Sequence, residues 1–181
     1  DNFMMKNFNL KDRRLNLKPW RDYKDKVKKC KKKVKIAMIG KYVDLLDSYK
    51  SLNEALYHAG VINNKTVEIT YLDSEKLTKR NIHQLKEMNG ILVPGGFGDR
   101  GIEGKILAAE YARVNNIPYF GICLGMQISV IEFARNVMKL NKANSTEFDK
   151  DTKNPVVALV EEWREDSGKR IFANMENMGG T

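Results

Sequence analysis

Short apolar runs that end near glycine or proline alternate with amphipathic helical patterns along this chain, and this alternation limits the folds open to it. Runs this short and apolar are typical of parallel strands that are buried on both faces, because parallel sheets are covered by helices. Strands that alternate with helices are typical of α/β proteins. The sequence therefore predicts an open, mostly parallel sheet flanked by helices. The predicted strands are 34–40, 65–73, 90–96, 117–122 and 155–160.

Four helices are predicted between these strands, from apolar residues that recur every three or four positions. Asp47 or Ser48 is expected to cap the first helix, and Gly60 is expected to end it. The segments 142–154 and 164–170 are predicted to be loops. The predicted helices are 47–60, 77–88, 101–116 and 124–140.

The positive charge of the chain is concentrated at its N-terminal end. Residues 1–35 hold 14 Lys and Arg against 4 Asp and Glu, a net of +10, and the whole chain of 181 residues carries +9. The remainder therefore has a net charge of −1. We interpret 1–33 as a basic linker or arm and 34–181 as the domain. The lysine-rich arm lacks the interleaved aromatic residues of a single-strand binding platform, so no nucleic-acid partner is predicted.

The two cysteines, Cys30 and Cys123, lie far apart in different sequence settings. Such a pair does not make a disulfide framework, which favours a reducing, cytoplasmic compartment. The N-terminal stretch has no apolar core of a signal peptide. No run approaches the roughly 18 to 20 apolar residues of a membrane span, so no membrane partner is predicted. No Cys and His spacing fits a metal site.

Residues 121–125 have the pattern Gly-x-Cys-x-Gly between a predicted strand and a predicted helix. In a nucleophile elbow a strained turn exposes the nucleophile at the carboxyl edge of the sheet, and flanking glycines let the neighbouring elements approach. Cys123 would then lie at a helix N-terminus, whose dipole favours negative charge. The alternative is that Cys123 is a small buried apolar residue. Cys30 has no such surroundings and is not predicted to be a nucleophile.

A second glycine-rich stretch, 94–104, holds five glycines in eleven residues between a predicted strand and a predicted helix. Glycines let main-chain N–H groups approach a ligand closely. The spacing matches neither common phosphate-binding motif. Acyl transfer through a thiol needs two N–H donors for the oxyanion, and this loop is a candidate for the second. The alternative is a flexible glycine turn without a function.

Two stretches of sequence together identify a family. "VPGGFGDRGIEGKI" and "IPYFGICLGMQ" resemble the class I, triad-type glutamine amidotransferases. "GKYVDLLDSYKSLNEAL", "NKANSTEF", "PVVALVEEW" and "MGGT" are similar to the corresponding stretches of the CTP synthase family. The resemblance runs from about residue 34 to the last residue. It implies the layered, flavodoxin-like arrangement of a class I glutamine amidotransferase with a nucleophile elbow.

The resemblance implies the roles of individual residues. Cys123 corresponds to the nucleophile that attacks the side-chain amide of glutamine. The main-chain N–H groups of Gly96 and Leu124 correspond to the oxyanion hole. These groups also belong to the substrate pocket in the family.

Further residues of the substrate pocket follow in the same way. Phe97, Gln127 and Glu147 match residues that hold glutamine. A carboxylate at 147 can accept the ammonium group of the substrate, and Gln127 lies one helical turn after Cys123. Arg100 lies in a loop that resembles a lid coupled to activation by GTP.

The resemblance also implies a reaction and partners. A glutaminase of this family hydrolyses L-glutamine through a cysteine thioester. The ammonia passes to a synthetase domain of the same polypeptide, which converts UTP to CTP. The glutaminase domain itself needs no cofactor, whereas the full-length enzyme is expected to use ATP and Mg²⁺, with GTP as activator, and to form a homotetramer.

The catalytic base is the main departure from the family pattern. The family uses a His and a Glu from a later motif, and neither His58 nor His83 matches it. We therefore expect this chain alone to be a glutaminase fragment with negligible turnover. Two alternatives stay open: another hydrolase with a cysteine elbow, such as a γ-glutamyl hydrolase or a DJ-1-like protein, or a non-catalytic relative kept for assembly or regulation.

Overall fold

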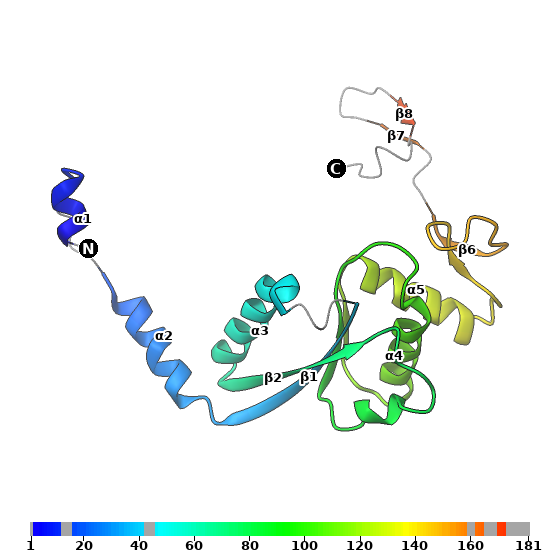
Figure 1. Ribbon diagram of the computed structural model, residues 1–181, viewed down its shortest axis with the longest axis horizontal. Helices are drawn as coiled ribbons and strands as arrows, with labels where there is room; N and C mark the ends of the chain where they lie inside the picture. The colour runs from blue at the N-terminus through cyan, green and yellow to red at the C-terminus, as the bar shows by residue number, and fades with distance from the viewer. Residues whose placement is uncertain (1, 12–15, 42–45, 159–161, 165–169, 173–181) are drawn as a thin grey trace.

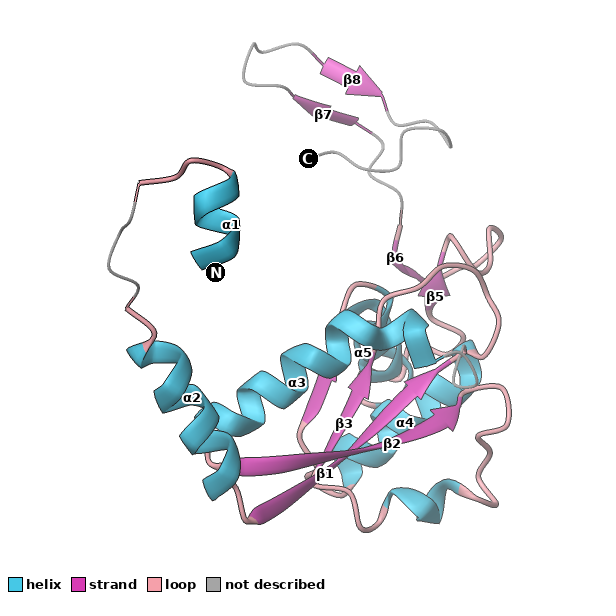
Figure 2. Cartoon of the chain, turned by 60° about the vertical axis from the view of Figure 1, so that its left-hand side comes forward, coloured by secondary structure: helices cyan, strands magenta, loops and turns pink. Residues whose placement is uncertain are grey.

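The computed structural model describes residues 2–11, 16–41, 46–158, 162–164 and 170–172. Its largest sheet has four parallel strands in the order β2-β1-β3-β4 (Figures 1 and 2). The predicted open parallel sheet is confirmed. The strands are β1 (Lys32–Gly40), β2 (Lys65–Asp73), β3 (Gly90–Val93) and β4 (Tyr119–Gly121).

Helices cover both faces of this sheet. Helix α3 (Lys50–Ile62) packs on one face, where Met38 and Leu92 are buried beneath it. Helix α4 (Ile102–Val114) packs on the other, against Ala37 and Ile39. Neighbouring residues of β1 thus point to opposite faces, as the pleat of a strand requires. Both faces are apolar because both are covered.

Helix α5 (Leu124–Asn136) follows β4 and packs beside α4. Ile128 and Ile131 on α5 bury against Ile102 and Ile106 on α4, in a second core on the same side of the sheet. This core joins the two helices that directly follow the glycine loop and the cysteine elbow. It therefore fixes the relative position of the two predicted functional turns.

Several predicted helix boundaries are wrong. The first helix has no side-chain cap from Asp47 or Ser48, because a 3-10 turn, η1 (Leu46–Tyr49), precedes it. Gly60 lies inside α3, and the helix ends at Ile62, with Asn63 as its C-cap. The helix predicted at 77–88 is a single 3-10 turn, η2 (Ile82–Leu85). Helix α5 ends at Asn136, four residues before the predicted end.

The segment after α5 forms small sheets of its own. β5 (Asn144–Ser145) lies in a predicted loop and pairs with β6 (Pro155–Val157). The predicted strand 155–160 is therefore confirmed over its first three residues, outside the main sheet, and 159–160 lie outside the described residues. The strands β7 (Glu162–Arg164) and β8 (Arg170–Phe172) pair antiparallel on either side of the predicted loop 164–170, and its residues 165–169 lie outside the described residues.

The basic arm contains two helices, α1 (Asn2–Asn7) and α2 (Lys18–Lys29). The ring of Tyr23 on α2 meets His58 of α3 edge to face, with centroids 5.9 Å apart. The strand β1 begins at Lys32, two residues before the predicted start of the domain. The division at residue 33 stays a prediction. Within the described residues, no helix is long and apolar enough to cross a membrane.

Candidate active site

Cys123 is the last residue before α5, and its backbone is strained. Its φ is +51° and its ψ is −108°, a combination that residues with a side chain rarely adopt. The side chain is exposed. A strained, exposed residue between a strand and a helix is the geometry of a nucleophile elbow. The structure thus places Cys123 as the motif predicted and excludes the alternative of a buried apolar residue.

The glycines on either side of Cys123 are required by close packing. A Cβ at Gly121 would lie 2.3 Å from the carbonyl oxygen of Gly125, and a Cβ at Gly125 would lie 2.1 Å from the carbonyl oxygen of Val93. Real Cβ atoms do not approach backbone oxygens this closely. The spacing Gly-x-Cys-x-Gly is therefore a packing requirement of the turn.

The glycine-rich loop lies directly beside the elbow. A Cβ at Gly95 would lie 3.5 Å from the Cβ of Cys123, and one at Gly96 would lie 3.5 Å from Cδ2 of Leu124. The N–H groups of Gly96 and Leu124 donate no hydrogen bond to any other described residue. Two main-chain donors thus remain available near the sulfur, as an oxyanion site needs.

Three side chains from separate elements tie the glycine loop down. Nζ of Lys41, which follows β1, donates a hydrogen bond to the carbonyl of Phe97. The N–H of Gly98 donates to Oε1 of Glu147 at 3.0 Å. Nε of Arg100 lies 2.5 Å from Oε1 of Glu75, which follows β2. The ion pair with Arg100 lowers the pKa of Glu75.

The predicted glutamine-binding residues lie around this loop and elbow. Phe97 is 74% exposed, and Glu147 reaches the loop through its contact with Gly98. The side-chain oxygen Oε1 of Gln127 is buried and has no hydrogen-bond partner within the described part of the chain. Buried polar atoms are normally paired, so Gln127 is suited to a ligand that donates a hydrogen bond. The roles of these residues stay predictions.

Both histidines make their contacts elsewhere. His58 is in α3, near Glu54 and Tyr23. His83 is in η2, where its Nδ1 lies 3.1 Å from the carbonyl of Arg80. No described contact brings either ring to Cys123. The expectation that they do not serve as the base agrees with these positions.

Sequence reasoning missed Tyr119, Lys41, Glu75 and Lys105. The hydroxyl of Tyr119 donates a 2.7 Å hydrogen bond to the carbonyl of Gly125, in the first turn of α5. Burial raises the pKa of Tyr119 well above its usual range. A signal for Lys105 was present, because it shares a helical face with Ala108 and Ala112, both fully buried.

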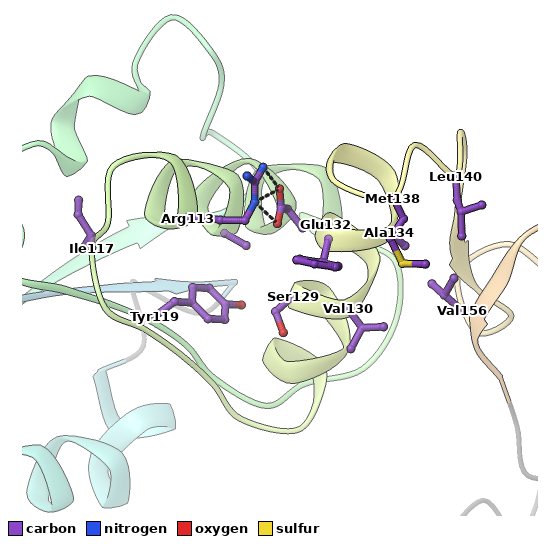
Figure 3. Close-up of a pocket in the computed structure, with 12 residues that line it drawn as sticks. Arg113, Ile117, Tyr119, Ser129, Val130, Glu132, Ala134, Met138, Leu140 and Val156 are labelled. Carbon is purple, nitrogen blue, oxygen red and sulfur yellow. Dashed lines mark hydrogen bonds and ion pairs between the residues drawn. The ribbon is translucent and has the colours of Figure 1, made fainter.

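A cavity of about 520 Å³ lies away from Cys123, between α4, α5 and β6 (Figure 3). Its lining is mostly apolar, with the side chains of Val130, Met138 and Val156 around it. Arg113 and Glu132 form a two-pronged ion pair at its side, with N–O distances of 2.7 to 3.0 Å. None of the predicted site residues lines this cavity.

Comparison with known proteins agrees with this geometry. The profile of the family described as glutamine amidotransferase class-I matches residues 44–172, well over half of the chain. This chain belongs to the class I glutamine amidotransferases. Within them, it is similar to the solved glutaminase domain of CTPS from Trypanosoma brucei with bound acivicin.

The likeness to this amidotransferase from Trypanosoma brucei extends to sequence and fold. The two chains are 43% identical, with a TM-score of 0.67, and the match covers 75% of this chain and 53% of the other. The chain thus spans about half the length of that solved domain. The family resemblance predicted from the elbow and the glycine loop is confirmed.

Proposed function

We propose that this chain is part of the glutaminase domain of a CTP synthase. The observation that carries the proposal is the strained, exposed Cys123 beside a glycine loop with two available N–H donors. The 43% identity to a CTPS glutaminase domain supports this member of the family over other hydrolases with a cysteine elbow. L-Glutamine is then the substrate.

In the proposed reaction, the sulfur of Cys123 bonds to the amide carbon of glutamine. The carbonyl π electrons move to oxygen, where the N–H groups of Gly96 and Leu124 receive the negative charge. The oxyanion collapses, the C–N bond breaks, and the amine leaves as ammonia after protonation. Water then cleaves the thioester to glutamate and restores the thiol.

The proton transfers need a base and an acid near Cys123. Since His58 and His83 make their contacts elsewhere, residues 1–181 alone are predicted to turn glutamine over negligibly. In the family the His and Glu come from a further segment of the polypeptide. Sustained hydrolysis of glutamine by residues 1–181 alone would contradict this assignment of the base.

The nucleotide partners are proposals for the full-length protein. From the resemblance to the CTP synthase family, we propose that ATP and Mg²⁺ act in a synthetase domain of the full-length protein. GTP is proposed to act at the glycine loop, where an exposed aromatic ring and a cation, Phe97 and Arg100, suit a base and a phosphate. The homotetramer and the cytoplasmic location stay predictions.

The experiment that tests this function compares two nitrogen sources in the full-length polypeptide. Replacement of Cys123 by Ser should abolish CTP formation from UTP, ATP and glutamine, while added ammonia should still support it. A Cys30→Ser variant is the matched control and should retain both activities. Glutamine-dependent CTP formation by the Cys123→Ser enzyme would refute the role of the elbow. Hydrolysis of γ-glutamyl peptides without CTP formation would favour the alternative hydrolase.

A further inference from the structure

Lys105, in the first turns of α4, is a buried cation that the proposed reaction does not use. It is 2% exposed. It borders a cavity of about 20 Å³, large enough for one water molecule. The other residues around this cavity are Gly40, Lys41, Tyr49, Pro94, Gly95 and Gly96.

Among the described residues, Lys105 has no partner that neutralises its charge. Within the described ranges, no carboxylate lies within 4 Å of Nζ, and its side chain makes no hydrogen bond. Glu75 favours the charge from a distance, but its carboxylate is paired with Arg100. A buried cation without a partner destabilises a fold. An apolar side chain of the same length would be less costly here, so the charge itself needs an explanation.

The position of Lys105 in the fold supplies an explanation for its buried charge. The cavity lies at the carboxyl ends of β1 and β3, where the strand order reverses. Ligands of open α/β sheets bind at this switch point. The loop of Gly95 and Gly96 borders the cavity and also touches the elbow, since a Cβ at Gly95 would lie 3.5 Å from that of Cys123.

We propose that the buried positive charge of Lys105, held behind the peptides of Gly95 and Gly96, stabilises the oxyanion that forms when Cys123 adds to its substrate. Lys105 is a positioning residue in this account, because it acts through the glycine loop and touches no reacting atom. The inference rests on the proposed glutaminase function. It adds a cation to an oxyanion site that otherwise consists of two neutral N–H donors.

The groups around Lys105 determine when it is charged. Burial, and after it the charge of Lys41 from the end of β1, lower the pKa of Lys105 to about 8, whereas Glu75 from the end of β2 raises it. Tyr49, just before α3, also borders the cavity. Lys105 therefore carries the positive charge that stabilises the oxyanion below about pH 8, and it loses this charge as the pH rises through that value.

The test measures binding of the γ-aldehyde analogue of glutamine. The thiol adds to the aldehyde: a C–S bond forms, the C=O π electrons move to oxygen, and the thiol proton passes to the buffer, so the adduct oxygen is the anion that Lys105 would stabilise. The adduct places an oxygen in the oxyanion site at equilibrium, so the measurement needs no catalytic base. Affinity is determined by isothermal titration calorimetry for the wild-type chain and for Lys105→Met, with Lys86→Met, an exposed lysine, as control.

We expect wild type to bind the aldehyde about tenfold more tightly than Lys105→Met at about pH 7, the effect of one unit charge at protein-like dielectric. The ratio of the wild-type affinity for the aldehyde to that of Lys105→Met should fall toward one by about pH 9.5, where Lys105 is neutral. The affinity for glutamine itself, which forms no oxyanion on binding, should change much less. Lys86→Met should match wild type throughout.

Three results would overturn the inference. They are a ratio near one at about pH 7, a ratio that does not change with pH, or an equal loss of affinity for glutamine and the aldehyde. The last two would assign Lys105 a packing role. If the wild-type chain binds neither compound, the proposed function fails first, which distinguishes that failure from the failure of the inference.

Discussion

Replacement of Lys105 by Met should stabilise the fold at neutral pH. The pKa of Lys105 in the folded chain is about 8, against an ordinary value of 10.5. A difference of about 2.5 units corresponds to about 3 kcal/mol, at 1.36 kcal/mol per unit. Met has a similar length and no charge, so the variant should gain most of this free energy of unfolding at about pH 7.

The pH dependence of the stability difference between Lys105→Met and wild type separates the effect of the charge from the effect of side-chain packing. Because the folded pKa is the lower one, the unfolded chain binds more protons between about pH 8 and 10.5, and wild-type stability rises with pH across this window. Below about pH 8 Lys105 is protonated in both states and its destabilising effect is fully present. The advantage of Lys105→Met should therefore shrink from about 3 kcal/mol at pH 7 toward zero near pH 10.5.

Urea unfolding followed by circular dichroism measures this difference at each pH. At neutral pH a gain of about 3 kcal/mol should raise Tm by about 6 to 12 °C for a chain of this size. Lys86→Met should leave stability within about 0.5 kcal/mol of wild type. The reasoning is refuted if Lys105→Met is less stable than wild type at pH 7, or if its advantage stays constant up to pH 10.5.

Three further substitutions test the packing of the site. Gly125→Ala should cost about 3 kcal/mol or more, because its Cβ would meet the carbonyl oxygen of Val93; urea unfolding with a wild-type midpoint would contradict this. Tyr119→Phe should cost about 1 kcal/mol through loss of the hydrogen bond to Gly125, and unchanged thermal unfolding would argue against that bond. Arg113→Gln should cost about 2 kcal/mol, since it leaves the buried carboxylate of Glu132 without its cation; Glu132→Gln in the same background should recover part of this loss.

The sequence predicted the parts of the fold that depend on local pattern. The strands of the main sheet and the order of elements follow from apolar runs and helical periodicity, and the elbow follows from two glycines at fixed spacing. Gly60 shows the limit of such reasoning. Its Cβ would lie 2.8 Å from Cγ2 of Val67, so this glycine lets α3 approach β2 and does not end the helix. A local signal does not distinguish these two uses of glycine.

Side-chain hydrogen bonds and long-range contacts explain the other misses. The helix predicted at 77–88 gives way to a turn in which Asn81 accepts from the N–H of Thr78 and donates to the carbonyl of Lys76. The ties of the glycine loop come from three strand ends or loops far apart in sequence, so no local pattern could have assigned Lys41 or Glu75 to it. The resemblance to a family identified the pocket residues, and the structure identified what holds them.

The most direct test of the account is a peptide map of the chain after exposure to a diazoketone that mimics glutamine, with and without excess glutamine. Cys30, whose thiol contacts the carbonyl of Lys26 on α2, serves as the reference for general thiol reactivity. The account predicts that Cys123 is alkylated, that glutamine protects it, and that labelling of Cys30 does not depend on glutamine. If Cys123 stays unmodified, or reacts equally with and without glutamine, the elbow is not a preformed glutamine site and the central claim is wrong.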